Sequence, residues 1–253
     1  MASLSALSLS IAMAMAAGLV GCFALMRRMS LAADAMAHVA LPGIGIALAL
    51  RLNPLLGGLA MLLAGTLLIW TLERRTEIST ETIIGVVFSA ALALGSMLAT
   101  GDELIEALLG APGAPTAAET ALGLVGAGAV IAFIVVQRNR LVLALMSADI
   151  ARTAGIDVAR LDLLYLFAFA VTVGLGLRYL GVLLMGSLII IPAATAKLLA
   201  RNLTTMLGVA VAAAVVSTLA GEWVAARLHS ATGPVIITIA AGLFLVGSIA
   251  RRR

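Results

Sequence analysis

Asp34 and His38 are the two residues of this sequence whose types and spacing most clearly allow chemistry. They are four positions apart, so on a helix their side chains lie on one face, one turn from each other. A carboxylate and an imidazole together suit Zn²⁺ or Mn²⁺, and the imidazole favours zinc. An equally open interpretation is that the two side chains satisfy each other at a helix start, with Asp34 near the favourable N-terminal dipole.

Two protein ligands are fewer than a closed metal site needs, so an ion held here would be weakly bound and partly hydrated, as transit requires. Glu222 and His229 are a second candidate pair, since residues seven apart roughly share a helical face. Residues of this kind more often simply lie at the membrane interface. The sequence contains no catalytic triad and no Gly-x-x-x-x-Gly-Lys-Ser/Thr phosphate loop, so we expect neither an enzyme nor a chain that hydrolyses ATP itself.

The elements that position these residues are predicted to be transmembrane helices. The chain is 63% hydrophobic and 11% charged, whereas a soluble domain carries about 25% charged residues. The apolar runs lack the alternation of a barrel strand, which predicts an all-α, polytopic bundle of eight or nine spans. The nine hydrophobic segments are roughly 8–26, 32–50, 55–72, 82–100, 121–137, 161–178, 182–200, 204–226 and 234–250.

The basic residues predict the topology. Thirteen of the 16 Lys and Arg residues fall in the segments 27–31, 73–81, 137–160, 197–203 and 251–253, which alternate with loops that hold the other three. The positive-inside rule places the basic loops and the carboxyl end in the cytoplasm and, with nine spans, the amino terminus outside. Eight spans would reverse the amino-terminal side. Because the positive charge is explained by topology, we expect no nucleic-acid binding.

The longest polar stretch on the predicted cytoplasmic side is a second candidate site, at about residues 147–157. Asp149 is suited to cap a short helix that ends at Gly155, a residue type favoured just past a helix. A short helix of this kind between two spans would present a docking surface to a partner. The alternative is an ordinary loop with one helical turn.

Pro192 marks a third candidate, inside the segment that also contains Gly186 and Ser187. Proline removes a backbone donor, so it would kink a membrane helix, and the surrounding small residues permit close backbone approach. The kink has a purely structural explanation, and its consequence could still be a gate. Elsewhere, glycines such as Gly57 and Gly128 predict tight helix packing, and Cys22 is expected to be a small buried packing residue.

These segments, in this order and spacing, resemble the zinc/manganese-uptake family of ABC permeases. The similarity covers nearly the whole chain. It rests on the blocks 33–43 (Ala-Asp-x-x-x-His-x-x-Leu-Pro-Gly), 81–95, 149–156, 186–196 and 232–234. The chain departs from the family pattern at 108–115, where two prolines stiffen an outer loop, and at 230–231, where a commonly acidic position is Ser or Ala.

The resemblance implies a single transmembrane permease domain, 1–253, with the fold of the vitamin B12-type importers, in the bacterial inner membrane. It implies a homodimer with cytoplasmic ATP-binding subunits and an external metal-binding protein, and no permanently bound cofactor beyond the transported Zn²⁺ or Mn²⁺. The family's translocation site falls on Asp34 and His38, and its seventh-span motif contains the residues of the candidate gate. Its ATPase-coupling segment falls on Asp149, Ala151, Arg152 and Gly155.

Three alternatives remain at this stage. The same permease class carrying manganese or iron would use the same kinds of ligand. A secondary transporter driven by an ion gradient would need intramembrane carboxylates, for which only Asp34 and Glu222 are available. A structural membrane subunit would transport nothing.

Overall fold

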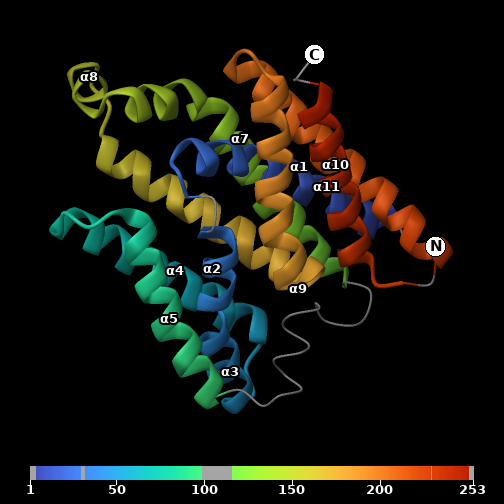
Figure 1. The fold of residues 1–253 in the computed structure, drawn as a ribbon. Helices are drawn as coiled ribbons and strands as arrows, with labels where there is room; N and C mark the ends of the chain where they lie inside the picture. Colours follow the sequence, from blue (N-terminus) through green and yellow to red (C-terminus); the bar gives the residue numbers. More distant parts are fainter. Residues whose placement is uncertain (1–3, 30–31, 99–115, 229, 251–253) are drawn as a thin grey trace.

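The computed structural model describes residues 4–29, 32–98, 116–228 and 230–250, and all of their regular secondary structure is α-helical. The helices are drawn in Figure 1. They are α1 (Leu4–Met26), α2 (Ala32–Val39), α3 (Leu41–Ala49), α4 (Pro54–Arg75), α5 (Thr80–Leu98), α7 (Ala117–Met146), α8 (Ala148–Thr153), α9 (Val158–Leu199), α10 (Leu203–Leu228) and α11 (Thr232–Ala250).

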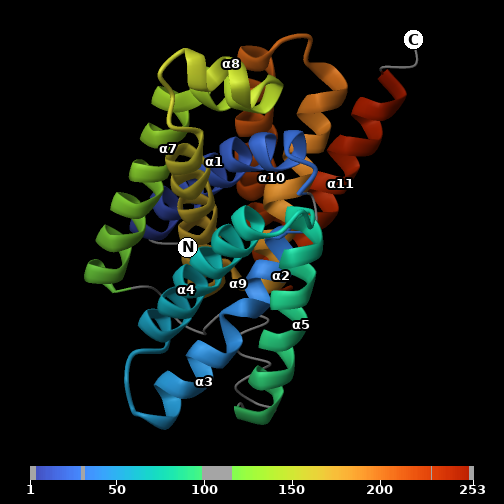
Figure 2. The same ribbon diagram turned by 90° about the vertical axis from the view of Figure 1, so that its left-hand side faces the viewer.

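The predicted membrane bundle is confirmed. Among the described residues, eight helical stretches are long and apolar enough to cross a bilayer, and the shorter apolar stretch Leu184–Leu199 makes the ninth predicted segment. Short α8 and the end of α11, both predicted to be cytoplasmic, lie at the same end of the bundle, opposite the turn between α3 and α4 (Figures 1 and 2).

Helix α9 is not straight but folds back on itself. A Cβ atom on Gly176 would lie 3.1 Å from the Cβ of Met185, although nine residues of straight helix rise by about 13 Å. Figure 1 shows the resulting first arm in yellow, running from α8, and the second arm in orange, returning along the bundle. The two arms correspond to the predicted segments 161–178 and 182–200.

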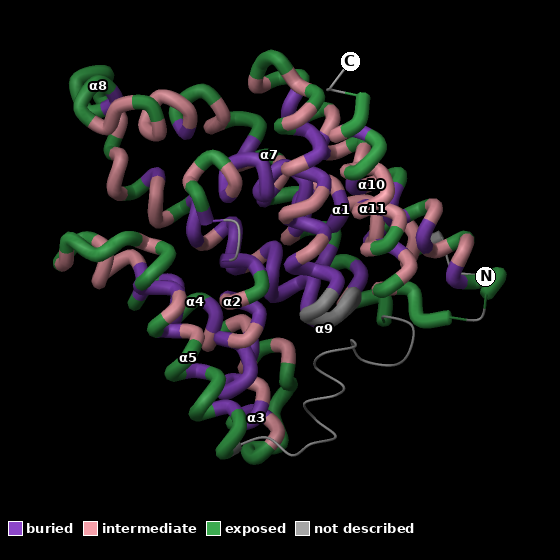
Figure 3. The backbone as a smooth tube through the Cα atoms, in the orientation of Figure 1, coloured by how far each residue is buried: buried purple, intermediate pink, exposed green. Residues whose placement is uncertain are grey.

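Helix α1 is the centre of the core. Of its most apolar stretch, 67% is buried, against 17% for α11, and Figure 3 shows buried residues where α1 meets the second arm of α9. Small residues allow this approach. A Cβ on Gly18 would lie 2.9 Å from the carbonyl oxygen of Ala210 in α10. Cys22 is fully buried as expected, with its Sγ 3.8 Å from the carbonyl oxygen of Met206.

The glycine predictions divide between two outcomes. Gly57 of α4 lies directly against Gly43 of α3, and a Cβ on Gly57 would be 3.1 Å from the carbonyl carbon of Gly43. That contact confirms tight packing there, because a side chain would force the two helices apart. In the glycine run 123–128 of α7 the prediction holds at Gly126, where a Cβ would lie 2.6 Å from the Leu175 side chain, but not at Gly128, where a Cβ would meet nothing within 4 Å.

Helix α7 extends beyond its predicted apolar segment at both ends. Its outer end is fixed by a capping box, in which Thr116 accepts from the Glu119 amide and the Glu119 side chain bonds the Thr116 amide. Its other end continues past Arg138 and Arg140 to Met146 and leads directly into α8. Thus α8 is joined to the bundle by helices on both sides.

Candidate functional site

Asp34 and His38 lie on the short helix α2, one turn apart, but they do not satisfy each other. No hydrogen bond or ion pair joins them in the part of the chain that the structure describes. Asp34 is exposed and His38 is half-buried. The Nδ1 atom of His38 is buried and has no hydrogen-bond partner, and the edge of the ring packs against Phe88 of α5, 5.5 Å between centroids.

An unpartnered buried ring nitrogen requires an explanation, because leaving a polar atom unpaired costs about 1–3 kcal/mol. A metal ion or a water molecule bound to it would supply a partner for this nitrogen, and the ligand interpretation of Asp34 and His38 stays a prediction. The exposed carboxylate one turn away supplies charge. The interpretation in which Asp34 and His38 pair with each other therefore loses its support, and the ligand interpretation gains it.

The hydrogen bonding of the span that carries these residues is interrupted at Ala40, although the Ala40 backbone itself stays helical, with φ −69° and ψ −25°. Helix α2 ends at Val39 and α3 begins at Leu41, with Ala40 between them. Pro42 lies in the first turn of α3 and has no amide hydrogen to donate to the carbonyl of His38, four residues earlier. Broken helices at membrane depth are tolerated where backbone is buried in protein or lines a polar path. The break therefore leaves a backbone carbonyl next to the candidate ligands.

Gly186, in the second arm of α9, lies against the backbone of Asp34. A Cβ at Gly186 would be 3.4 Å from the Cα of Asp34, which is ordinary van der Waals contact. The structure thus brings the start of the predicted gate segment to the metal-ligand candidate. Ser187 is half-buried beside it, and Pro192 is buried inside the same arm. The sharp reversal of α9 lies between its arms, not at Pro192.

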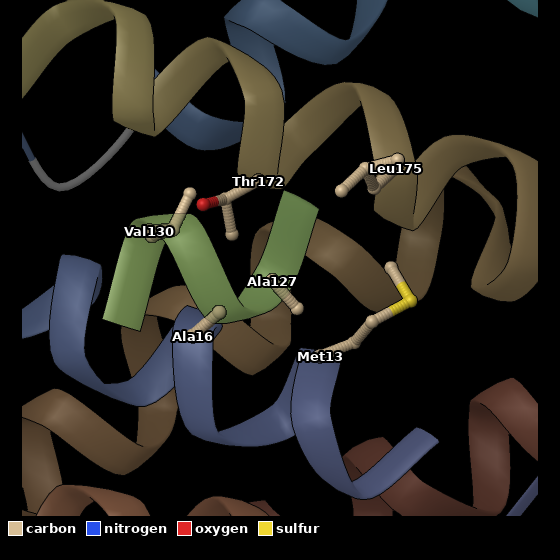
Figure 4. A pocket seen from close by; sticks show the side chains of 6 residues that line it. All are labelled: Met13, Ala16, Ala127, Val130, Thr172 and Leu175. Atoms are coloured by element: carbon tan, nitrogen blue, oxygen red, sulfur yellow. The ribbon is translucent and has the colours of Figure 1, made fainter. Parts of the chain in front are cut away.

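Other described parts of the chain offer no richer metal site. Among the described residues, no group of three or more His, Cys, Asp or Glu side chains is placed to hold a metal ion. A narrow crevice between α1, α7 and α9 (Figure 4) is apolar and has no room for a water molecule. Its one polar side chain, Thr172, donates to the carbonyl of Ala168 in its own helix. The crevice therefore reflects packing.

Of the second candidate pair, Glu222 and His229, the structure describes only Glu222. Glu222 is half-buried on α10, near the exposed Trp223, over whose ring Arg227 lies at 4.9 Å. His229 lies outside the described residues. The prediction that this pair meets a metal therefore stays untested.

The polar segment at 147–157 contains the predicted short helix, α8. The prediction that Asp149 caps it is wrong: the cap is Ser147, whose side chain accepts from the Ile150 amide. Both residue types cap helices well, and the helix starts two residues earlier than expected. Asp149 instead forms an exposed ion pair of 3.0 Å with Arg152.

Gly155 occupies the position predicted for it, with φ +77°. The amide of Gly155 donates to the carbonyl of Arg152, and the amide of Ile156 donates to that of Ala151, each at 3.0 Å. These two bonds form a Schellman motif that closes α8. Ala151 is fully buried, while Ile150 is 59% exposed. The helix therefore has one packed face and one apolar residue free for a partner.

Three contacts at this end of the bundle were not predicted. Arg27, just after α1, forms an ion pair of 2.5 Å with Asp162 of α9, and its guanidinium lies over the ring of Tyr165. Trp70 of α4 donates to the carbonyl of Ala159. A sequence signal existed for Asp162, because an acidic residue inside an apolar segment requires a partner. Nothing in the sequence indicated which residue that partner is.

The fold and this arrangement are those of a multi-pass helical membrane protein, with a short helix, α8, at one end of the bundle and two polar side chains on a proline-interrupted span. The chain matches the ABC 3 transport family over residues 2–251 and belongs to that family. It is thus the membrane-spanning permease subunit of an ABC transporter, located in the bacterial inner membrane, and is not itself an enzyme.

Relatives with curated names cover most of the chain. It is 27% identical to the high-affinity zinc uptake system membrane protein ZnuB of Haemophilus influenzae, over 92% of each chain. It is 29% identical to the manganese transport system membrane protein MntC of Halalkalibacterium halodurans, over 94% of this chain and 84% of that one. It is 28% identical to the chelated iron transport system membrane protein YfeD of Yersinia pestis, over 91% and 79%.

Solved structures confirm the fold. The structure of PsaBC from Streptococcus pneumoniae in complex with Fab matches with a TM-score of 0.82 at 26% identity, over 96% of this chain and 89% of that chain. An inward-facing putative metal-chelate type ABC transporter matches with a TM-score of 0.76 at 18% identity, over 96% and 84%. The second likeness concerns the fold alone.

Proposed function

We propose that this permease imports a divalent metal ion by ATP-driven alternating access, with zinc as the first candidate and manganese as the second. The names of its relatives support the class of substrate, since they include zinc, manganese and chelated-iron systems. The buried and unpartnered Nδ1 of His38 is the observation that carries the proposal. An imidazole ligand favours zinc over harder cations.

Asp34 and His38 are proposed to contact the ion in transit. Two protein ligands leave at least two positions of a tetrahedral ion to water, so the ion is bound weakly enough to leave. The backbone at the break between α2 and α3 supports this role. Transporters commonly place carbonyls of interrupted helices beside a cation, and Pro42 leaves the carbonyl of His38 without its helical amide partner.

Gly186, Ser187 and Pro192 are proposed to form the gate. Gly186 supports this role because it lies against the Asp34 backbone. A displacement of the second arm of α9 would therefore move the residues that line the site. Pro192 provides a position where the arm bends at reduced cost, because one helical hydrogen bond is already missing.

ATP hydrolysis is proposed to belong to separate cytoplasmic subunits that dock on α8, with Asp149, Ala151, Arg152 and Gly155 as the coupling residues. The exposed side chains of Ile150 on α8 and of Met146 at the end of α7 fit this role, since exposed apolar residues suit a partner's groove. Two copies of the permease, and an external protein that delivers the metal, complete the proposed assembly. Family membership argues against the gradient-driven and purely structural alternatives.

The test is metal uptake into proteoliposomes that contain the permease, its ATP-binding subunit and its metal-binding protein. We expect ATP-dependent Zn²⁺ uptake that falls at least about tenfold in His38→Ala and in Asp34→Asn. The matched control is Ser248→Ala on α11, whose exposed hydroxyl bonds its own helix, and which should transport normally. Uptake of Mn²⁺ or iron alone would keep the class and change the metal. Uptake without ATP would refute the proposal.

A further inference from the structure

The first turns of α9 are bound to the residue that follows α1 by a partly buried ionic contact. The guanidinium of Arg27 is 2.5 Å from the Asp162 carboxylate and 4.4 Å from the centre of the Tyr165 ring. Tyr165 is fully buried, and its hydroxyl donates to the carbonyl of Val20. Val20 lies about two helical turns before Arg27. The Arg27 side chain is only 13% exposed. These contacts join one region of α9 to one region of α1.

This ion pair differs from the other two in the described part of the chain. The pairs Arg152–Asp149 and Arg160–Asp157 join residues three apart on one helix, and both are largely exposed. Exposed pairs of this kind contribute little. Arg27 and Asp162 are 135 residues apart, and they join the turn after α1 to helix α9. The Asp162 side chain is 32% exposed, so the pair is only partly desolvated. Removing one partner still leaves the other charge without its counter-charge, so the pair joins the start of α9 to the segment that follows α1.

On its α9 side the pair is closely attached to α8. The Schellman motif ends α8, and Asp157 then caps α9 by accepting from the Arg160 amide at 3.1 Å. Only four residues, 154–157, separate the two helices, and the hydrogen bonds at both ends of this joint restrict its backbone. A movement of α8 therefore displaces the first turns of α9, where Asp162 lies.

On its α1 side the pair is close in sequence to the proposed metal ligands. Arg27 lies in the short connection between α1 and α2 and precedes Asp34 by seven residues. The pair thus bonds the start of α9, which follows α8, to the connection that leads into α2, which carries Asp34 and His38. The other route from α8 to α2 follows the whole first arm of α9 to Gly186 and its packing contact with the Asp34 backbone, and it is far longer.

We propose that Arg27 and Asp162 are positioning residues for transport, which carry the displacement of the docking helix to the helix that holds Asp34 and His38. The proposal rests on the proposed function. It assigns a role in coupling to two residues that contact neither the metal nor the ATP-binding subunit. Their charge pair, and not merely the volume of their side chains, transmits the movement.

The experiment compares Arg27→Gln, Asp162→Asn and the double variant in the complete proteoliposome system, with ATP hydrolysis and metal uptake measured on the same vesicles. Each single variant should retain ATP hydrolysis within about twofold, while the metal transported per ATP falls on the order of fivefold. The double variant should be no worse than the poorer single one, since both remove the same contact. Arg160→Gln, which breaks an exposed pair nearby, is the matched control and should behave as wild type.

Rescue separates coupling from folding. The conservative variant Arg27→Lys and the exchanged pair R27D/D162R each restore a charge pair, and both should recover most of the transport per ATP. Unchanged transport per ATP in the single variants, additive losses in the double variant, or equal losses of ATP hydrolysis and uptake would each overturn the proposal. If the single variants fail to assemble and neither rescue restores transport, the pair is structural only. Failure of the wild-type complex to take up metal would instead refute the proposed function.

Discussion

Replacing Gly155 with Val tests the backbone conformation at the end of α8, the proposed docking helix, without a new packing clash. The residue has φ +77°, and a Cβ atom there would meet nothing within 4 Å. The whole cost is therefore conformational. An ordinary residue in the left-handed region costs roughly 1–2 kcal/mol, a β-branched residue lies at or above the upper end of that range, and Asn lies below it.

That cost acts on a marginal element. Helix α8 has six residues, and a helix so short depends on its cap and its tertiary contacts. The two bonds of the Schellman motif contribute about 1 kcal/mol each, so the strain is similar in size to what closes the joint. A shift of 1–2 kcal/mol changes the ratio of closed to open joints by about five- to thirtyfold. Since Val lies at the upper end of that cost, we expect Gly155→Val to lower metal transport per ATP by about thirtyfold.

The assay is ATP turnover and metal uptake in the assembled complex, with thermal unfolding of the purified permease as a check on the membrane fold. Gly155→Asn is the matched control, because it tolerates the same backbone angle and should lose much less. Equal behaviour of the Val and Asn variants would show that the left-handed backbone is irrelevant to coupling. A Val variant that couples normally would remove α8 as the docking helix.

Three further predictions concern the bundle. Gly57→Ala should lower the unfolding midpoint measured in detergent and cost about 2 kcal/mol or more, because its Cβ would collide with the facing backbone. Gly128→Ala, with open space around it, is the control and should change stability by less than about 1 kcal/mol. Ser217→Ala should be neutral or stabilising by up to about 1 kcal/mol in the same assay, since the buried Ser217 hydroxyl has no partner. A loss of stability equal to or larger than that in Thr218→Val, which removes a bonded hydroxyl, would contradict this. Pro42→Ala should allow a continuous helix and lower the rate of metal uptake at least about threefold while the protein still folds, and an unchanged uptake rate would show that the break is not needed.

The number and place of the helices were predictable because long apolar runs in a chain with few charges have only one stable solution in lipid. Each of the nine predicted segments corresponds to a helical stretch. Their ends were less predictable. At α7, Arg138 and Arg140 indicated an end, but charged residues do not interrupt backbone hydrogen bonds, so the helix continues to Met146. The break at Ala40 had a sequence signal in Pro42, which was noted only as part of a motif.

The two candidate ligands were predictable as a pair on one face, because that follows from spacing alone. Whether they bond each other was not, since side-chain orientation depends on neighbours from distant segments. Phe88 of α5 packs on the His38 ring, and Gly186 of α9 packs on the Asp34 backbone. The prediction of Asp149 as the cap was wrong for a different reason: Ser147, an equally good cap, stands two residues earlier.

Cys22 offers a consequence for experiments on the working transporter. It is the only cysteine of the sequence, and its thiol is enclosed between α1 and the carbonyl of Met206 on α10. A thiol-reactive dye therefore finds no native target while these helices stay together. Cysteines introduced at exposed positions can be labelled without first removing a native one, and any labelling of Cys22 during turnover reports that α1 and α10 have separated.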